Sequence, residues 1–195
     1  MWQPGFGDAV RQSQSTFRLA LAAMARPGSI ENCNPQLLPP PPLSAPAAAL
    51  LLTLADFETP VWLDHQLAES PEVADFVRFH TGARLVASPA AAAFAVVADA
   101  ARLPPLGGFQ QGTPEYPDRS TTILMQVATL EARGWRLEGP GIPHAARLRA
   151  APVPSQFLSE LARNRSRFPR GVDIFFITPN AIAALPRSVR VAEAA

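Results

Sequence analysis

The chain has 195 residues, which suits one domain with its own core, because a domain of about this size buries roughly 70% of the surface that its unfolded chain exposes. Apolar residues make up 48%, charged residues 17%, and the net charge is +1, which argues against a disordered chain or a nucleic-acid-binding protein. All 17 basic residues are arginine, so the chain alone cannot form a Schiff base with pyridoxal phosphate, a phosphate-binding P-loop or a protein-kinase-type site, each of which needs a lysine.

Cysteine content and apolar runs indicate the compartment. Cys33 is the only cysteine, which excludes an internal disulfide and a cysteine zinc site, and this fits a reducing cytoplasm. The start of the sequence lacks the pattern of a signal peptide. The longest apolar run, residues 47–55, is far shorter than the roughly 20 residues that span a bilayer. We therefore expect a cytoplasmic protein without a membrane segment.

The first predicted element is a helix that Asp8 caps, running to about Ala25 before Pro27-Gly28 ends it. It carries large apolar residues on one face, at spacings of seven, four and three: Val10, Phe17, Leu21 and Met24. We expect this face to lie in the core, and the alternative is a partner-binding face.

The middle of the chain predicts a proline-rich surface loop (35–46), an apolar helix (47–57) and a short strand (61–63). A second amphipathic helix begins at Ser70-Pro71-Glu72 and ends at Gly82. Its predicted apolar face consists of Val73, Phe76, Val77 and His80. Two buried strands are expected at 85–88 and 94–99, before a loop-rich segment at 100–119.

The C-terminal part predicts mainly strands. TTILMQVATL, 121–130, is expected to be the longest strand, with 135–139 returning as a hairpin around Gly134. A helix at 156–166 follows, then a fully buried strand at 172–178, and 181–191 is either a final strand pair or an extension broken by Pro186. The alternation of helices and strands predicts an α/β fold, with a mixed sheet covered by helices on both faces.

Two local patterns leave their roles open. Four arginines, Arg163, Arg165, Arg167 and Arg170, indicate either a solvated helix end or contact with an anion or a partner. His80, in the last turn of its helix, can interact with the helix dipole, line an anion pocket with Arg78 and Thr81, or act as a general acid–base. None of the three histidines has a second ligand at metal-binding spacing, so no metal site is predicted.

Several motifs, in order along nearly the whole chain, together resemble one family. They are FRLALAAMARPGSI (17–30), LLTLADFETPVWL (51–63), RFHTGARLV (78–86), AFAVV (93–97), PDRSTTILMQV (117–127), LEGPGI (137–142) and FPRGVDIFFIT (168–178) with LPR (185–187). This pattern resembles the PhnH family, a subunit of the bacterial carbon–phosphorus lyase system that breaks down phosphonates.

The resemblance implies one domain over 1–195, a cytoplasmic homodimer, and a fold similar to the large domain of pyridoxal-phosphate-dependent transferases without the cofactor. It also implies a complex with the G, I and J subunits. That complex makes ribose 1-phosphonate 5-triphosphate from ATP and an alkylphosphonate, before a radical enzyme cleaves the carbon–phosphorus bond. This chain cannot hold the radical enzyme's iron–sulfur cluster, because one cysteine does not supply the thiolates.

We therefore expect an accessory subunit without catalytic residues or a cofactor of its own. The competing hypothesis is a nucleotide- or phosphonate-binding subunit that contributes residues to the transferase site. The candidates are polar residues within the apolar motif blocks: Arg78, His80, Thr81, Asp118 and Arg187.

Overall fold

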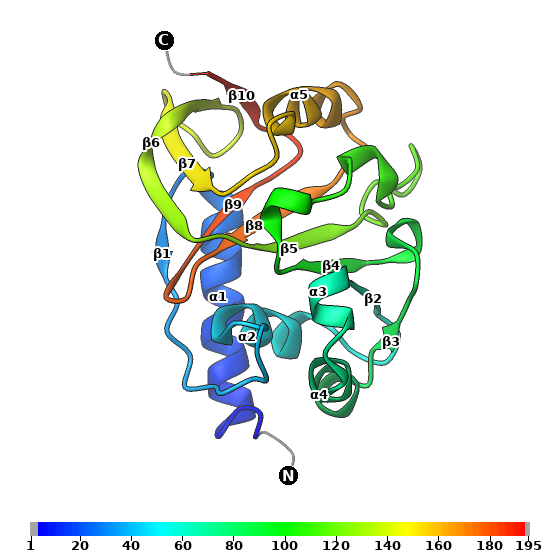
Figure 1. Cartoon of the computed structure of the whole chain (residues 1–195). Helices are drawn as coiled ribbons and strands as arrows, with labels where there is room; N and C mark the ends of the chain where they lie inside the picture. Colours follow the sequence, from blue (N-terminus) through cyan, green and yellow to red (C-terminus); the bar gives the residue numbers. More distant parts are fainter. Residues whose placement is uncertain (1–3, 194–195) are drawn as a thin grey trace.

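The computed structural model describes residues 4–193, which form a mixed sheet and a smaller antiparallel sheet (Figure 1). The main sheet has the order β1-β9-β8-β5-β4-β2-β3, and the small sheet has the order β10-β6-β7. The strands of the main sheet are β1 (Glu31–Asn32), β2 (Pro60–Leu63), β3 (Arg84–Leu85), β4 (Phe94–Val97), β5 (Thr122–Gln126), β8 (Asp173–Ile177) and β9 (Ala181–Leu185). Those of the small sheet are β6 (Thr129–Glu138), β7 (Ala146–Ala151) and β10 (Arg190–Ala192).

Helices cover both faces of the main sheet. The α-helices are α1 (Ala9–Ala25), α2 (Ala45–Leu54), α3 (His65–Ala68), α4 (Pro71–Thr81) and α5 (Phe157–Ser166). Short 3-10 helices lie at Pro89–Ala91, Ala100–Arg102 and Leu106–Gly108. One face carries α1, α2 and α4, and the other carries α5 with the small sheet (Figure 1). Within residues 4–193, no helix combines the length and apolarity needed to cross a membrane.

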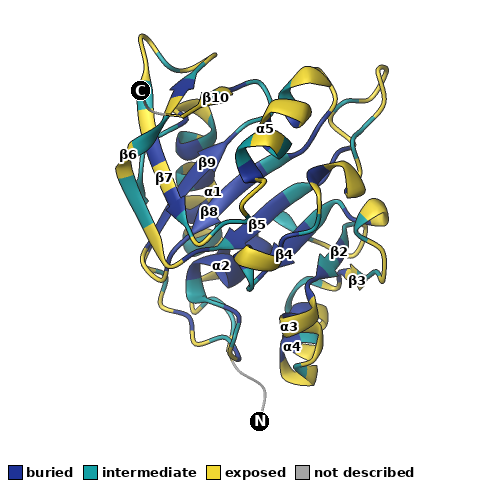
Figure 2. Cartoon of the chain, turned by 45° about the horizontal axis from the view of Figure 1, so that its top comes forward, coloured by how far each residue is buried: buried dark blue, intermediate teal, exposed yellow. Residues whose placement is uncertain are grey.

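The central strands are apolar on both sides because both of their faces are covered. Leu124 and Phe175 pack into the layer that contains α1 and α2. Ile123 and Ile174, their neighbours along the same strands, pack into the layer that contains α5 and the small sheet. Figure 2 shows these strands buried between exposed outer surfaces. The predicted mixed sheet with helices on both faces is therefore confirmed.

The predicted long strand at 121–130, with a hairpin at Gly134, is wrong. Val127 donates its N–H to Ile177 in the main sheet, and Ala128 donates its own to Ala151 at the end of the small sheet. Because these consecutive bonds go to different sheets, the apolar run divides into β5 and β6. Gly134, at φ +83°, lies at an irregularity within β6, and the hairpin to β7 turns later, through 139–145.

Other boundaries differ less. The helix predicted at 47–57 begins at Ala45 and ends at Leu54, and the strand predicted at 85–88 is only Arg84–Leu85. The helix after Ser70 is confirmed as α4, and Gly82 ends it in the left-handed conformation at φ +69°. The Ser70 side chain does not cap the helix, however, and its hydroxyl donates to Glu72 Oε2 at 3.1 Å instead.

Helix α1 begins where the sequence predicts, because the Asp8 side chain accepts a hydrogen bond from Arg11 N at 3.0 Å. The predicted core face is wrong for three of its four residues, however, and only Met24 is partly buried and packs against the core cluster. Val10, Phe17 and Leu21 are 79%, 50% and 58% exposed. The buried residues of α1 are small: Thr16, Ala20 and Ala23. The alternative, a partner-binding face, stays a prediction.

Candidate functional site

The five candidate residues lie at or near one edge of the main sheet. Strands β2, β3, β4, β5 and β8 are parallel, so their amino ends meet at this edge. Asp118 precedes β5, Arg187 lies beside the start of β8, and the C-terminal turn of α4 leads into β3. Strands β3 and β8 are four positions apart in the sheet, or roughly 19 Å at about 4.8 Å per strand. The candidates therefore form two separate groups.

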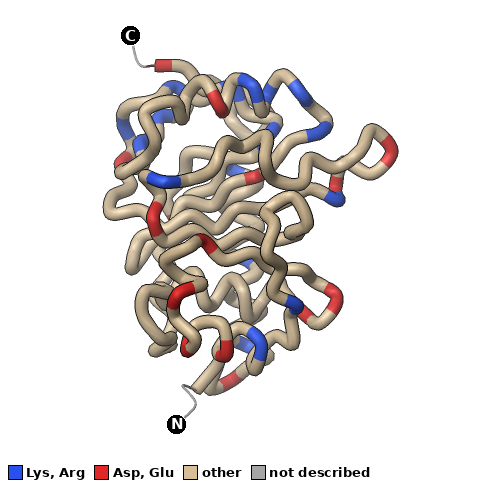
Figure 3. Tube along the Cα trace, turned by 45° about the vertical axis from the view of Figure 1, so that its right-hand side comes forward, with Lys and Arg blue, Asp and Glu red and all other residues tan. Residues whose placement is uncertain are grey.

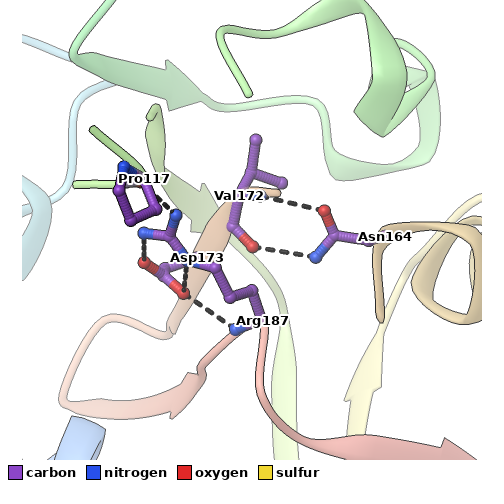
Figure 4. Close-up of polar contacts among 5 residues, drawn as sticks. All are labelled: Pro117, Asn164, Val172, Asp173 and Arg187. Carbon is purple, nitrogen blue, oxygen red and sulfur yellow. Dashed lines mark hydrogen bonds and ion pairs between the residues drawn. The ribbon is translucent and has the colours of Figure 1, made fainter. Parts of the chain in front are cut away.

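The first group is organised around an ion pair between Arg187 and Asp173 (Figure 4). Arg187 Nη2 lies 2.5 Å from Asp173 Oδ2, and its Nε lies 3.2 Å from Oδ1. The backbone N–H of Arg187 also donates to Asp173 Oδ1 at 2.8 Å, and Nη1 donates to the Pro117 carbonyl oxygen at 2.5 Å. The two side chains are only 15% and 13% exposed.

These bonds give Arg187 a structural role. It joins the segment after β9 to the start of β8 and to the loop before β5. Removing one member of a largely buried ion pair typically costs roughly 3–5 kcal/mol, because the other charge loses its partner. The neighbouring Asp118 is exposed, so its carboxylate is accessible to solvent, whereas the Arg187 side chain is largely buried.

The start of β8 is also fixed from the other side, by Asn164 of α5. Its side-chain amide donates to the Val172 carbonyl oxygen and accepts from Val172 N, both at 2.9 Å (Figure 4). Gly171 has φ +122°, and a Cβ atom there would lie 2.7 Å from Asn164 Oδ1. The FPRGVD motif thus has a structural explanation, since glycine permits both the backbone angle and the close approach.

The second group lies at the end of α4. Arg78 is exposed and lies 3.9 Å from Asp75. Thr81 Oγ1 donates to the Val77 carbonyl oxygen at 2.7 Å and accepts from Ala83 N at 3.0 Å, so this hydroxyl serves the helix end.

His80 is half-buried between aromatic rings and the N-terminal segment. Its ring centroid lies 4.5 Å from that of Phe76 and 5.0 Å from that of Phe79. A Cβ atom at Gly5 would approach His80 Nδ1 to 2.8 Å, so the chain near Gly5 packs closely against the imidazole. These contacts support the structural interpretation of His80, and a binding role for it stays a prediction.

The opposite edge of the sheet contains a residue that the sequence did not single out. Asp64 follows β2 and is 7% exposed. Its carboxylate accepts from Leu67 N at 3.0 Å, Ala98 N at 2.8 Å and Asp99 N at 2.9 Å. The connections from neighbouring β2 and β4 leave on opposite faces of the sheet, an arrangement that often creates a ligand crevice in α/β proteins. Here the protein's own carboxylate takes these N–H donors.

A hollow of about 310 Å³ lies beside Asp64 at this carboxyl edge, near the lower limit for ligand pockets. It includes Ser44 and Gln126. Gln126 Oε1 accepts from Ser44 N at 2.6 Å, and its amide nitrogen donates to the Pro42 carbonyl oxygen at 3.0 Å. Gln126 therefore fixes the proline-rich loop to the sheet, and both polar atoms of its side chain are already engaged in these hydrogen bonds.

The described residues offer neither an activated thiol nor a metal-ligand cluster. Burial raises the pKa of the Cys33 thiol to about 11, so it is protonated and weakly nucleophilic at neutral pH. Over residues 4–193, no group of three or more histidine, cysteine or acidic side chains could hold a metal ion.

The fold and these contacts define an α/β protein whose sheet edges are stabilised by its own charged side chains. The chain belongs to the family described as bacterial phosphonate metabolism protein (PhnH), whose model matches residues 4–192. It is similar to the alpha-D-ribose 1-methylphosphonate 5-triphosphate synthase subunit PhnH of Rhizobium meliloti (strain 1021), with 37% identity over 98% of this chain and 96% of the relative. It is also 30% identical to the putative C-P lyase subunit protein HtxG of Stutzerimonas stutzeri, over 41% of this chain and 42% of that protein.

Proposed function

We propose that this chain is an accessory subunit of the carbon–phosphorus lyase core complex and acts with G, I and J subunits. It supports the formation of ribose 1-phosphonate 5-triphosphate from ATP and an alkylphosphonate, and the later cleavage of the carbon–phosphorus bond. The family match and the relative described as a synthase subunit support this proposal. Under this proposal, residues 1–195 form one cytoplasmic domain that dimerises and provides no catalytic residue.

We also propose that the fold is similar to the large domain of pyridoxal-phosphate-dependent transferases, in a form that does not use the cofactor. The absence of lysine from the sequence supports only the lack of the cofactor, because the Schiff base to it needs a lysine amine.

The structural observation that carries the subunit role is an exposed seam on α1. We define the α1 seam as Val10, Gln14, Phe17 and Leu21, which follow one another at spacings of four, three and four. This is the repeat by which helices pack against other helices. All four residues are exposed, while the opposite face of α1 contacts α2 and β9.

Charges beside the α1 seam favour a partner other than a second α1. Arg11 and Arg18 lie along one side of the seam, at about 100° per residue around the helix. Two antiparallel α1 helices packed through their seams would bring these arginine edges together, which is unfavourable. The surface fits an apolar groove with an acidic rim on another subunit, so we assign the homodimer contact to a different surface.

The test is to co-express Phe17→Glu with the G, I and J subunits and to measure co-purification. We expect at least about a tenfold loss of complex, because a charge would enter an apolar contact. Phe57→Glu is the matched control, since Phe57 is 74% exposed and lies outside α1. It should assemble normally.

Light scattering of the isolated variants separates the alternatives. The expected result is that Phe17→Glu keeps the oligomeric state of the unmodified chain. Conversion to monomers would show that the α1 seam joins two copies of this chain. Full co-purification of Phe17→Glu would show that the seam is not a docking surface.

A further inference from the structure

A concave surface lies between α5 and β10, which are neighbours at the C-terminal end of the molecule (Figure 1). Its volume is about 360 Å³, and its lining residues are Ala162, Arg165, Ser166, Arg190 and Val191. Both of its charged residues are arginines, and the described residues contribute no carboxylate to the lining. We call it the arginine concavity.

Arg165 is unusual within this surface, because its Nε is buried and has no hydrogen-bond partner in the described structure. Its guanidinium carbon lies 5.0 Å from the centroid of the Phe168 ring. That ring contact supplies no acceptor for the Nε–H. A buried donor without an acceptor is unfavourable, and such groups in native proteins call for a physical explanation.

A solvated helix end explains Arg163 but not Arg165. Arg163 lies on the same helix, and its Nη2 contacts Glu160 Oε1 at 2.5 Å. The last carbonyl oxygens of α5 already accept local bonds, from Ser166 Oγ at 2.8 Å, Arg167 N at 3.2 Å and Phe168 N at 3.1 Å. The carbonyl groups therefore do not depend on the Arg165 guanidinium for a donor.

The distribution of charge along the chain would attract an anion to this end. Residues 128–195 contain ten of the 17 arginines but only five of the 16 acidic residues. Figure 3 shows basic residues gathered at the end of the molecule that carries the C-terminus, with most acidic residues elsewhere. Such a separation concentrates anions near the positive end and speeds their association.

We propose that the arginine concavity binds a small phosphate or phosphonate oxyanion through Arg165 and Arg190. A guanidinium presents several N–H donors in a plane, which matches the oxygen atoms of these groups. The Nε–H of Arg165 would then gain the acceptor that it lacks, and the exposed Arg190 would supply the second charge. The proposal does not depend on the α1 seam or on assembly with other subunits.

Isothermal titration calorimetry of the purified chain tests this, with inorganic tripolyphosphate and methylphosphonate as probes. Arg165→Lys keeps the charge but removes the planar set of donors, and Arg190→Ala removes an exposed charge. We expect each variant to bind at least one probe about tenfold or more weakly than the unmodified chain.

Arg163→Ala is the matched control, because it removes one positive charge from the same helix without altering the lining. It should change the affinity by no more than about twofold. Thermal unfolding confirms the fold of each variant, and if Arg165→Lys does not fold, Arg190→Ala provides the comparison.

Three outcomes would overturn the proposal: neither probe binds the unmodified chain, Arg163→Ala weakens binding as much as the lining variants do, or the folded lining variants bind normally. Equal weakening would indicate diffuse attraction to the basic end of the molecule. Loss confined to the lining variants supports the site, and the preferred probe then identifies the anion class.

Discussion

Helices α1 and α4 have similar sequence patterns but opposite relations to the core. Each begins after a capping-type residue and carries large apolar side chains on one face. In α4 these side chains are buried: Val73, Phe76 and Val77. In α1 the corresponding large side chains form most of the exposed seam. An apolar helix face can therefore serve either the core or a partner.

The difference comes from how each helix meets its neighbours. Helix α1 contacts α2 and β9 and buries Ala20 and Ala23, whose small side chains permit a close approach. Helix α4 contacts α2, α3 and β3 and uses the bulk of Phe76 to fill its layer. The volume available beside a helix, as well as its apolar pattern, determines which face becomes core.

The largest expected effect is in α4. Phe76 is 3% exposed, so Phe76→Ala should lower the free energy of unfolding by about 3–5 kcal/mol, because it leaves a cavity. Phe17→Ala, the counterpart in α1, should change it by no more than about 0.5 kcal/mol in the isolated chain. Urea unfolding measures both. Equal losses would contradict the assignment of Phe17 to the surface.

The second prediction concerns the core face of α1. Ala23 is fully buried, so Ala23→Leu should cost about 1–3 kcal/mol through overpacking. Ala25→Leu adds the same side chain at an exposed position of α1 and should have an effect within about 0.5 kcal/mol. Urea unfolding of the two variants distinguishes the faces. A neutral Ala23→Leu would mean that α1 lies less close to its neighbours than described.

The smallest expected effect concerns Cys33, in the same core cluster as Ala20 and Ala23. Burial raises its pKa from 9.0 to about 11, so the folded state favours the protonated thiol. This contribution to stability is complete below pH 9 and declines as the pH rises to about 11. Urea unfolding across that range should show the decline in the unmodified chain.

Cys33→Ala should lose this part of the pH dependence, which makes it the control. The native thiol should also react slowly with a thiol reagent at pH 8 and rapidly in urea. Fast reaction of the thiol in the folded protein would show that the core cluster containing Cys33 and the buried face of α1 opens to solvent.

The motif blocks singled out Arg187 as a candidate binding residue. Its contacts in the structure are with Asp173, 14 residues away in the sequence, and with the Pro117 carbonyl oxygen, 70 residues away. No local pattern reveals such a pairing. The sequence does not indicate the role of Asp64, because a single acidic residue after a short strand matches no motif. Its hydrogen bonds to Ala98 and Asp99 form only when β2 and β4 lie side by side.

By itself, the sequence determined the resemblance to the PhnH family, the alternation of helices and strands, and the ends of α4, because a proline at the first helical position, a glycine after the last and apolar runs act over a few residues. Only the tertiary structure decided that β5 and β6 belong to different sheets, that Arg187 is held in a largely buried ion pair, and that Val10, Phe17 and Leu21 of α1 face outward. Those outcomes depend on volumes and charges brought together from distant parts of the chain, which local patterns do not specify.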